Sequence, residues 1–283
     1  MPRCVAALAF CLALPFAAPA AASTELAQAS PPAAAGQSQS GCAVVAQGPA
    51  RTRLAARDTR LALAAGEVKI SFIGHSTFEI ESPAGVRAAT DYNDVVRPAR
   101  TPDIATMNKA HSTHNSRSPD PGIKHLLPGW NPAGGPARHD VTERDMRVRN
   151  VSTNIRDWGS STDYSGNSIF IFETSGLCVA HLGHLHHTLD ADKLADLGRV
   201  DVLLVPVDGS WTMDQQGMIE VIEQIKAPLM IPMHYFSGAA LERFIGRLGD
   251  RVAVRRAETG TLTVSRDSLP DKPTLMVLPG RLF

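Results

Sequence analysis

The chain has 283 residues, and its 28 lysines and arginines balance its 28 aspartates and glutamates. A net charge near zero, with no basic tract and only 5% aromatic residues, argues against nucleic-acid binding. The roughly 220 residues that follow Ala65 are enough for one sizeable hydrophobic core.

Residues 1–22 have the pattern of a secretory signal. A short basic start, Pro2-Arg3, precedes the apolar run "CVAALAFCLALPFAAPAAAS", which ends in small residues that suit a signal peptidase near Ala20 to Ser23. The alternative, an N-terminal anchor, needs a longer span. No later run approaches about 18 apolar residues. We therefore expect an exported chain, periplasmic or secreted, without a membrane span in its mature form.

Residues 23–65 form a low-complexity linker, with some helix expected at 51–64. Two cysteines, Cys42 and Cys178, remain after removal of the signal. A disulfide between them would suit an oxidising compartment. The favoured interpretation is instead a free core cysteine, Cys178, and a separate loop cysteine, Cys42. The sequence has no CxxC motif, so cysteine-bound zinc is not expected.

Residues 66–283 form the predicted domain, which begins with an antiparallel meander. Strand-like runs at 68–73, 77–81 and 86–90 are separated by short turns. Residues 117–165 are rich in proline, glycine and charge. We expect them to be a long loop, either a cover over a site or a surface insertion.

The second half alternates strands with helices. The runs "NSIFIFET" and "LCVAHL" flank a Ser175-Gly176 turn, and "VDVLLVPV" and "APLMIPMH" are apolar throughout, as buried strands are. A helix is expected within "TMDQQGMIEVIEQIK", where Thr212 and Gln215 have capping-box spacing, and another within "GAALERFIGRLG". Sheets with helices outside them indicate a layered α/β protein.

Histidines gather where these strands end. His111 and His114 follow "DIATMN", His234 closes "LMIPM", and a further group follows "LCVA": His181, His184, His186 and His187. Loops at strand ends commonly carry binding sites, and three or more converging imidazoles hold zinc or a similar divalent metal.

The order of six stretches resembles the metallo-β-lactamase superfamily over roughly residues 68–264. They are "FIGHSTFEIES", "TDYND", "DIATMNKAHSTHNS", "GNSIFIFETSGLCVAHLGHLHHTL", "DVLLVPVDGSWTMD" and "IPMHY". The resemblance is closest to the branch of the ascorbate-phosphate lactonases and the phospholipase D that cleaves N-acyl phosphatidylethanolamine. It implies an αββα four-layer sandwich with a site at one edge, between the two sheets.

The metal signature of that family, H-x-H-x-D-H, reads K-A-H-S-T-H here. Lys109 and Thr113 replace two ligands, whereas His111 and His114 are retained. Further along, "HLGH" puts His184 where the resemblance implies a metal-bridging aspartate, and no histidine stands in "NVSTNIRDWG". The final family histidine is retained as His234. The resemblance therefore implies one divalent metal, zinc with manganese or iron as alternatives, held by His114, His184 and His234 with His111 near.

Other residues receive provisional roles. Asp208 is a candidate ligand or general base, or a turn aspartate before Gly209. Lys109 is a candidate for binding an anionic group of the substrate, or a tether of its own loop. His75 and Asp91 match family positions near the site, and they join His181 behind the ligands.

Three functions compete. The first is a secreted metal-dependent hydrolase of an ester, lactone or phosphodiester, acting on a small molecule, either neutral or anionic, through a non-standard mononuclear site. The second is a non-catalytic ligand-binding protein on the same scaffold, because both family carboxylates are lost. The third is a metal-free enzyme that uses Lys109 and the histidines for acid–base chemistry. An antibiotic-degrading lactamase is disfavoured by the altered ligands.

Overall fold

The structure is a computed structural model that describes Cys42, residues 63–156 and residues 161–280. The predicted signal, most of the linker and nearly all of the helix expected at 51–64 lie outside the described residues. Among the helices of the described part, none is long and apolar enough to cross a membrane.

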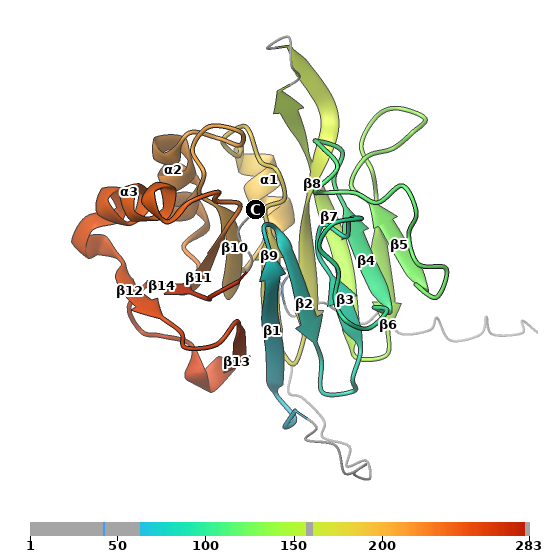
Figure 1. The fold of residues 1–283 in the computed structure, drawn as a ribbon, viewed down its shortest axis with the longest axis horizontal. Helices are drawn as coiled ribbons and strands as arrows, with labels where there is room; N and C mark the ends of the chain where they lie inside the picture. The colour runs from blue at the N-terminus through green and yellow to red at the C-terminus, as the bar shows by residue number, and fades with distance from the viewer. Residues whose placement is uncertain (1–41, 43–62, 157–160, 281–283) are drawn as a thin grey trace, which may run out of the picture. The chain divides into compact units, whose positions relative to one another are not determined.

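Two mixed sheets form the body of the fold (Figure 1). In the first, the strand order is β13-β1-β2-β3-β4-β5, with bounds β1 Glu67–Gly74, β2 Thr77–Glu81, β3 Arg87–Ala89, β4 Ile104–Met107, β5 His125–Pro128 and β13 Thr261–Ser265. In the second, the order is β12-β14-β11-β10-β9-β8-β7-β6, with bounds β6 Asp140–Glu143, β7 Met146–Arg156, β8 Thr162–Thr174, β9 Leu177–His181, β10 Val202–Pro206, β11 Leu229–Met233, β12 Ala253–Arg256 and β14 Thr274–Val277.

Strand patterning explains how the sheets stack. In β1 every second residue is buried, as expected for a strand with one face on a core. Its inward residues, such as Ile70, pack with Phe78 of β2 and with Phe170 and Leu204 of the larger sheet, so one core fills the space between the sheets. The predicted meander is confirmed, because β1, β2 and β3 pair antiparallel in sequence order.

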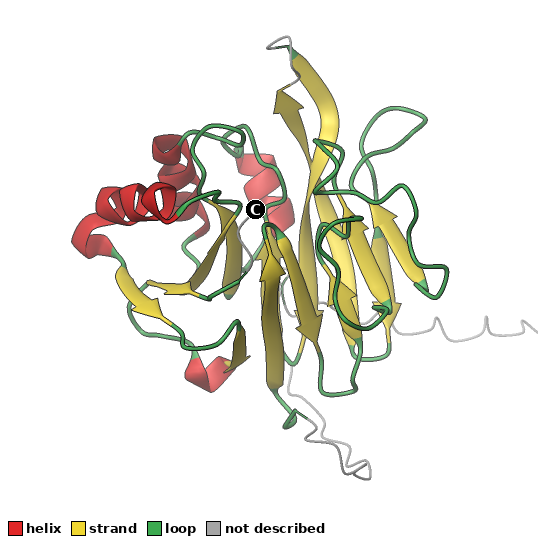
Figure 2. Ribbon diagram, viewed as in Figure 1, coloured by secondary structure: helices red, strands yellow, loops and turns green. Residues whose placement is uncertain are grey.

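The larger sheet is buried on both faces. Five-residue β10 and β11 are buried throughout, because the three helices α1 Ala191–Leu197, α2 Gln215–Ile225 and α3 Gly238–Leu248 cover their second face (Figure 2). Phe244 of α3 lies in a second core with residues of β8, β10 and β11. Short 3-10 turns at Gly249–Arg251 and Arg266–Ser268 complete the described elements.

The predicted two-sheet α/β sandwich is confirmed, with one difference in its outermost layer. The outer face of the smaller sheet carries a small cluster of Ala89, Tyr92, Ala105 and Met107. Within the part of the chain that the structure describes, loops rather than helices lie on that cluster. Both faces are nevertheless covered, which parallel strands such as β3 and β4 require.

The expectation that residues 117–165 form a long loop is wrong. This segment contains β5, β6 and β7 and the start of β8, and β7–β8 is the longest hairpin of the larger sheet. Polar and charged residues alternate with buried ones along "MRVRNVSTNIR", since one face of β7 is only partly buried. That alternation was the strand signal, and the high charge and glycine content of the flanks concealed it.

Two smaller expectations are also wrong. Helix α2 begins at the N-cap Asp214, whose side chain accepts from the backbone N–H groups of Gln216 and Gly217, so Thr212 and Gln215 form no capping box. Cys42 and Cys178 are not free, because they form a disulfide across a sequence separation of 136 residues. Spacing along the sequence gave no sign of this pairing, because the two cysteines meet only in the folded chain.

Candidate metal centre

Sheet topology brings the predicted site residues to one edge. Strands β9, β10 and β11 run parallel, so their carboxyl ends meet there. His184, Asp208 and His234 lie in the loops that follow these three strands in turn. From the smaller sheet, Asp91 follows β3, and the loop with His111 and His114 follows β4, which is parallel to β3.

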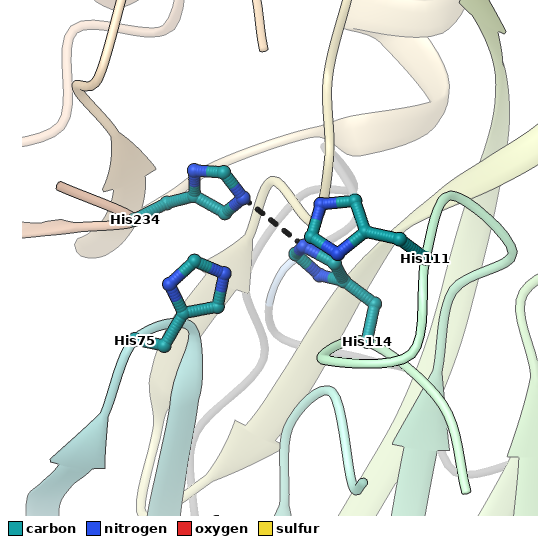
Figure 3. A group of neighbouring side chains, drawn as sticks. All are labelled: His75, His111, His114 and His234. Carbon is teal, nitrogen blue, oxygen red and sulfur yellow. Dashed lines mark hydrogen bonds between the residues drawn. The ribbon is translucent and has the colours of Figure 1, made fainter. Parts of the chain in front are cut away.

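Five imidazoles gather at this edge. The ligand-capable atoms of His75, His111, His114 and His234 all lie within 4.8 Å of one another, and Figure 3 shows these four rings facing each other from three separate loops. His184 Nε2 lies 3.0 Å from His111 Nε2. The structure thus brings together all four predicted ligands and adds His75, which the sequence had placed behind them.

His114 is held by a buried carboxylate. Its Nδ1 donates to Asp91 Oδ2 at 2.5 Å, and both side chains are fully buried. Asn108 donates to the other oxygen, Asp91 Oδ1, at 3.0 Å. Burial raises the pKa of Asp91, while the nearby His181 and the donor Asn108 oppose this rise. Asp91 therefore occupies the supporting position that the sequence assigned to it, and it fixes the tautomer of His114.

His234 is held in the same way by Asp208. Its Nδ1 donates to Asp208 Oδ1 at 3.1 Å, and Thr212 Oγ1 donates to the same oxygen at 2.5 Å. Asp208 Oδ2 accepts the backbone N–H groups of Ser210, Trp211 and Thr212. Burial alone would raise the pKa of Asp208, but the hydrogen bonds from His234 and Thr212 outweigh it and hold that pKa below its usual value.

His114 and His234, each with a carboxylate at its Nδ1, point their Nε2 atoms at each other. Each Nδ1 carries the proton that it donates, so each Nε2 presents a lone pair. His114 Nε2 and His234 Nε2 lie 3.1 Å apart (dashed line in Figure 3). Two lone pairs at this distance repel unless a positive charge lies between them. Tetrahedral ligands with Zn–N bonds of about 2.0–2.1 Å stand about 3.3 Å apart, so the donor set fits a metal ion.

The cluster is electrostatically suited to bind a cation. Burial, reinforced by the neighbouring His234, lowers the pKa of His75 to about 2 and that of His111 to about 4. Burial also lowers the pKa of His114 and of His184 well below 6.5. These imidazoles are neutral at pH 7, which is the form that binds metal.

Backbone conformation fixes three residues of the site in an unusual geometry. His75 and His234 have positive φ angles of 53° and 52°, and Asp91 has 41°. Non-glycine residues rarely adopt this region, and such conformations cluster at functional sites. The backbone N–H of His234 donates to the carbonyl of His75 at 2.8 Å, which joins the β1–β2 turn to the loop after β11. The two sheets are thereby linked at the site.

His184 has a different kind of partner. Its Nδ1 lies 2.6 Å from His186 Nε2, and His186 Nδ1 accepts the backbone N–H of Arg156 at 2.8 Å. Arg156 also donates through Nη2 to the carbonyl of Thr212. In the sequence, His186 was named only as one of the histidines after "LCVA", and Arg156 was not singled out. The closeness of His184 and His186 in the sequence could have predicted their contact. The contact of Arg156 with His186 could not be predicted in this way, because it depends on the position of the β7–β8 hairpin.

The remaining predicted residues lie nearby with defined partners. Lys109 Nζ lies 2.6 Å from Asp163 Oδ2 at the start of β8, so its charge is matched within the protein. Of the two roles left open for Lys109, this contact is the loop tether. His181, at the end of β9, hydrogen-bonds through Nε2 to the carbonyl of Ser76 and lies 3.9 Å from Asp91.

Two aromatic side chains border the histidines. Trp211 is 49% exposed and Phe236 41% exposed, although large apolar residues are mostly buried in this protein. The ring centroid of Phe236 lies 5.4 Å from those of both His75 and His234, and the Trp211 centroid lies 6.5 Å from that of His111. Exposed aromatic residues beside a polar centre are typical of a binding surface.

Comparison with known proteins gives consistent matches. The model of a β-lactamase superfamily domain matches residues 69–234. A metal-dependent hydrolase of Pyrococcus abyssi is 28% identical over 226 residues, and the match covers 66% of this chain and 95% of that protein. A metal-dependent hydrolase of Carboxydothermus hydrogenoformans is 31% identical over 108 residues, which cover 36% of this chain and 48% of that protein.

Solved structures agree at the level of the fold. A Thermotoga maritima protein assigned as a Zn-dependent hydrolase of the metallo-β-lactamase superfamily superposes with a TM-score of 0.56 at 26% identity, covering 76% of this chain and 100% of that one. The metallo hydrolase Igni18 of Ignicoccus hospitalis has a TM-score of 0.51 at 19% identity, covering 70% of this chain and 99% of that one.

Proposed function

The chain belongs to the β-lactamase superfamily, and on that basis we propose that it is a metal-dependent hydrolase with a single divalent ion among its histidines. The observation that carries the proposal is the pair of facing Nε2 atoms on His114 and His234, each with a carboxylate behind it. The relatives named metal-dependent hydrolases and the Thermotoga structure support the same reading.

The ligand set consists of His114, His234 and one further histidine of the cluster, His75 or His111, which leaves a fourth position for water. No carboxylate belongs to this cluster among the described residues, because Asp91 and Asp208 point at the Nδ1 atoms behind it. A second dication would need a bridging anion to offset like-charge repulsion. We therefore propose one ion, zinc by its preference for tetrahedral nitrogen ligands, with manganese or iron as alternatives.

Each residue then has a defined task. Asp91 and Asp208 keep Nδ1 of their histidines protonated and aim Nε2 at the ion. All hydrogen-bonding positions that Asp208 offers are engaged by six donors, so it is a positioning residue and not a free general base. A divalent ion in this position polarises a carbonyl or phosphoryl oxygen and lowers the pKa of water toward neutrality.

The substrate class follows from the border of the site. We propose an ester, lactone or phosphodiester of a small molecule whose apolar part packs on Trp211 and Phe236. An anionic substrate was one expectation, based on Lys109. Because Lys109 is paired with Asp163, apolar contact is favoured over charge as the source of affinity.

Metal analysis tests the proposal. Protein purified without a histidine tag should contain about one equivalent of a transition metal. Chelation should abolish hydrolysis of p-nitrophenyl acetate or bis(p-nitrophenyl) phosphate, and added zinc should restore it. The double variant His114→Ala/His234→Ala should lose both metal and activity, while His125→Gln, on the edge strand β5, should keep both. Less than about a tenth of an equivalent, with no gain on reconstitution, would sink the idea.

We also propose that the protein is exported. The Cys42–Cys178 disulfide supports an oxidising compartment, and residues 1–22 have a signal-like pattern. Expression in a bacterial host followed by fractionation should recover the protein in the periplasm. Its N-terminal sequence should then start between Ala20 and Thr24. Recovery of the intact N-terminus from the cytoplasmic fraction would contradict export.

A further inference from the structure

The hydrogen-bond partners of His186 show which of its two ring nitrogens carries the proton. His186 Nδ1 accepts the backbone N–H of Arg156 at 2.8 Å and the guanidinium Nε–H of the same residue at 3.3 Å. An atom that accepts two N–H groups carries no proton of its own. A ring with an unprotonated Nδ1 carries its proton on Nε2.

That proton determines the tautomer of His184. His186 Nε2 lies 2.6 Å from His184 Nδ1, so His186 donates and His184 Nδ1 accepts. A neutral imidazole with an unprotonated Nδ1 carries its proton on Nε2. His184 Nε2 is the atom that faces the cluster, and its proton is donated to His111 Nε2 at 3.0 Å, so His75 rather than His111 completes the ligand set. His184 therefore presents an N–H group to the site, and a nitrogen that carries a proton cannot bind a metal.

We propose that His184 is a hydrogen-bond donor of the active site and not a metal ligand. This inference rests on the proposed function and revises the ligand set expected from the sequence. On substrate binding this N–H turns from His111 Nε2 to the carbonyl or phosphoryl oxygen of the substrate, which gains negative charge during attack by water. Arg156 and His186 act as positioning residues, since they hold the proton of His184 on the nitrogen that faces the substrate.

The surroundings of His184 support this role. Its backbone N–H donates to Asn167 Oδ1 at 2.8 Å, and the side chain is almost fully buried, so the N–H group is fixed in place. A preorganised donor in a water-poor site stabilises developing charge most effectively, and removal of one such donor typically costs about 10²–10³-fold in kcat. The metallo-β-lactamase resemblance placed a metal-bridging aspartate here, so an acceptor-only group has become a donor.

Nitrogen NMR reads the tautomer directly. In protein labelled with ¹⁵N-histidine, the His184 ring, identified by its loss in His184→Gln, should show a proton on Nε2 and none on Nδ1. The pattern should persist after one equivalent of Zn²⁺ is added. A protonated Nδ1 in the zinc-loaded protein, the pattern of an Nε2-bound ligand, would overturn the proposal. This readout requires no activity.

Metal binding of matched variants gives a second readout. His184→Gln should bind Zn²⁺ within about three-fold of the wild-type affinity, and its Co²⁺-loaded form should keep the wild-type visible absorption spectrum. His114→Gln, the same exchange at a proposed ligand, should weaken binding strongly and alter that spectrum. If His184→Gln alters the cobalt spectrum as His114→Gln does, His184 is a ligand and the inference is wrong. If wild-type protein binds neither metal, the proposed function itself fails.

The kinetic signature separates donation from simple packing. The assay uses p-nitrophenyl acetate or bis(p-nitrophenyl) phosphate, whichever the wild-type protein hydrolyses faster. His184→Ala should lower kcat about 10²–10³-fold, with metal content unchanged and KM altered little. His184→Gln, whose amide can donate, should recover part of that loss. An equal loss of kcat in both variants would count against a hydrogen-bond donor.

Discussion

The two sides of the histidine cluster differ in what lies behind each imidazole. His114 and His234 have carboxylates at Nδ1, so they direct lone pairs toward the centre. His184 has the N–H donor His186 at Nδ1, so it directs a proton toward the same centre. The side chains are chemically identical and all buried. A ring's second partner therefore decides whether a buried histidine binds a cation or donates a hydrogen bond.

Removal of the disulfide should have the largest effect on stability and little effect on either side of the cluster. Cys42→Ala should lower the free energy of unfolding by about 2–4 kcal/mol, because the bond closes a long loop in the unfolded chain. Urea unfolding with and without reductant measures this difference, and metal content should stay at one equivalent. Equal stability of the variant and the oxidised wild type would contradict the expectation.

Asp208→Asn should weaken metal binding, because Asp208 holds His234 with its Nε2 lone pair toward the centre of the cluster. An amide offers one acceptor and one donor, so it cannot accept from His234 and from the three backbone N–H groups together. We expect metal affinity to fall about 10–100-fold, measured by competition with a chromophoric chelator. The exposed Asp120→Asn provides the matched control. Unaltered affinity in Asp208→Asn would show that His234 needs no carboxylate.

His186→Asp should convert His184 from a hydrogen-bond donor into a metal ligand. A carboxylate behind His184 would accept a hydrogen bond from Nδ1–H, so the proton would move to Nδ1 and leave Nε2 free for a metal. We expect metal binding to tighten by about ten-fold and kcat on the p-nitrophenyl probes to fall. The cobalt spectrum should report an added imidazole. If binding weakens instead, the second partner does not set the role of His184.

Lowering the pH should gradually decrease the stability of the metal-free protein, because histidines throughout the cluster become protonated on unfolding. We expect this effect to be smaller than those of the substitutions above. Burial lowers the folded-state pKa of His75 to about 2 and of His111 and His186 to about 4, against 6.5 unfolded. The unfolded chain therefore binds more protons below 6.5, so their contribution is present above pH 6.5 and is lost as pH falls toward 4. Chelator-treated protein should show a Tm that decreases from pH 7 to pH 5. A flat profile would refute this.

Trp211→Ala should have the smallest effect, because it alters only the border that both sides share. The KM for an aromatic ester such as p-nitrophenyl acetate should rise by about three- to ten-fold, with metal affinity unchanged. Tyr164→Ala, a more exposed aromatic residue of β8, is the control. If KM is insensitive to Trp211 but kcat falls, the indole serves the chemistry and not apolar binding.

Much of the fold could be predicted from local patterns. Alternation in β1 and continuous apolar runs in β10 and β11 identified their strands, since burial on one or both faces selects those patterns. β7 was missed because its partly buried face carries arginines and its flanks are rich in glycine and proline. The Cys42–Cys178 bond was missed because the two cysteines meet only in the folded chain.

The sequence by itself determined the family framework and the set of histidines at the strand ends, because both are properties of order and spacing. The tertiary structure decided the role of each histidine. Asp91 precedes His114 by 23 residues, and Arg156 lies 30 residues from His186, so no local pattern links them. A proton's position on an imidazole is set by its hydrogen-bond partners, and those partners come together only when two sheets and the β7–β8 hairpin meet at one edge.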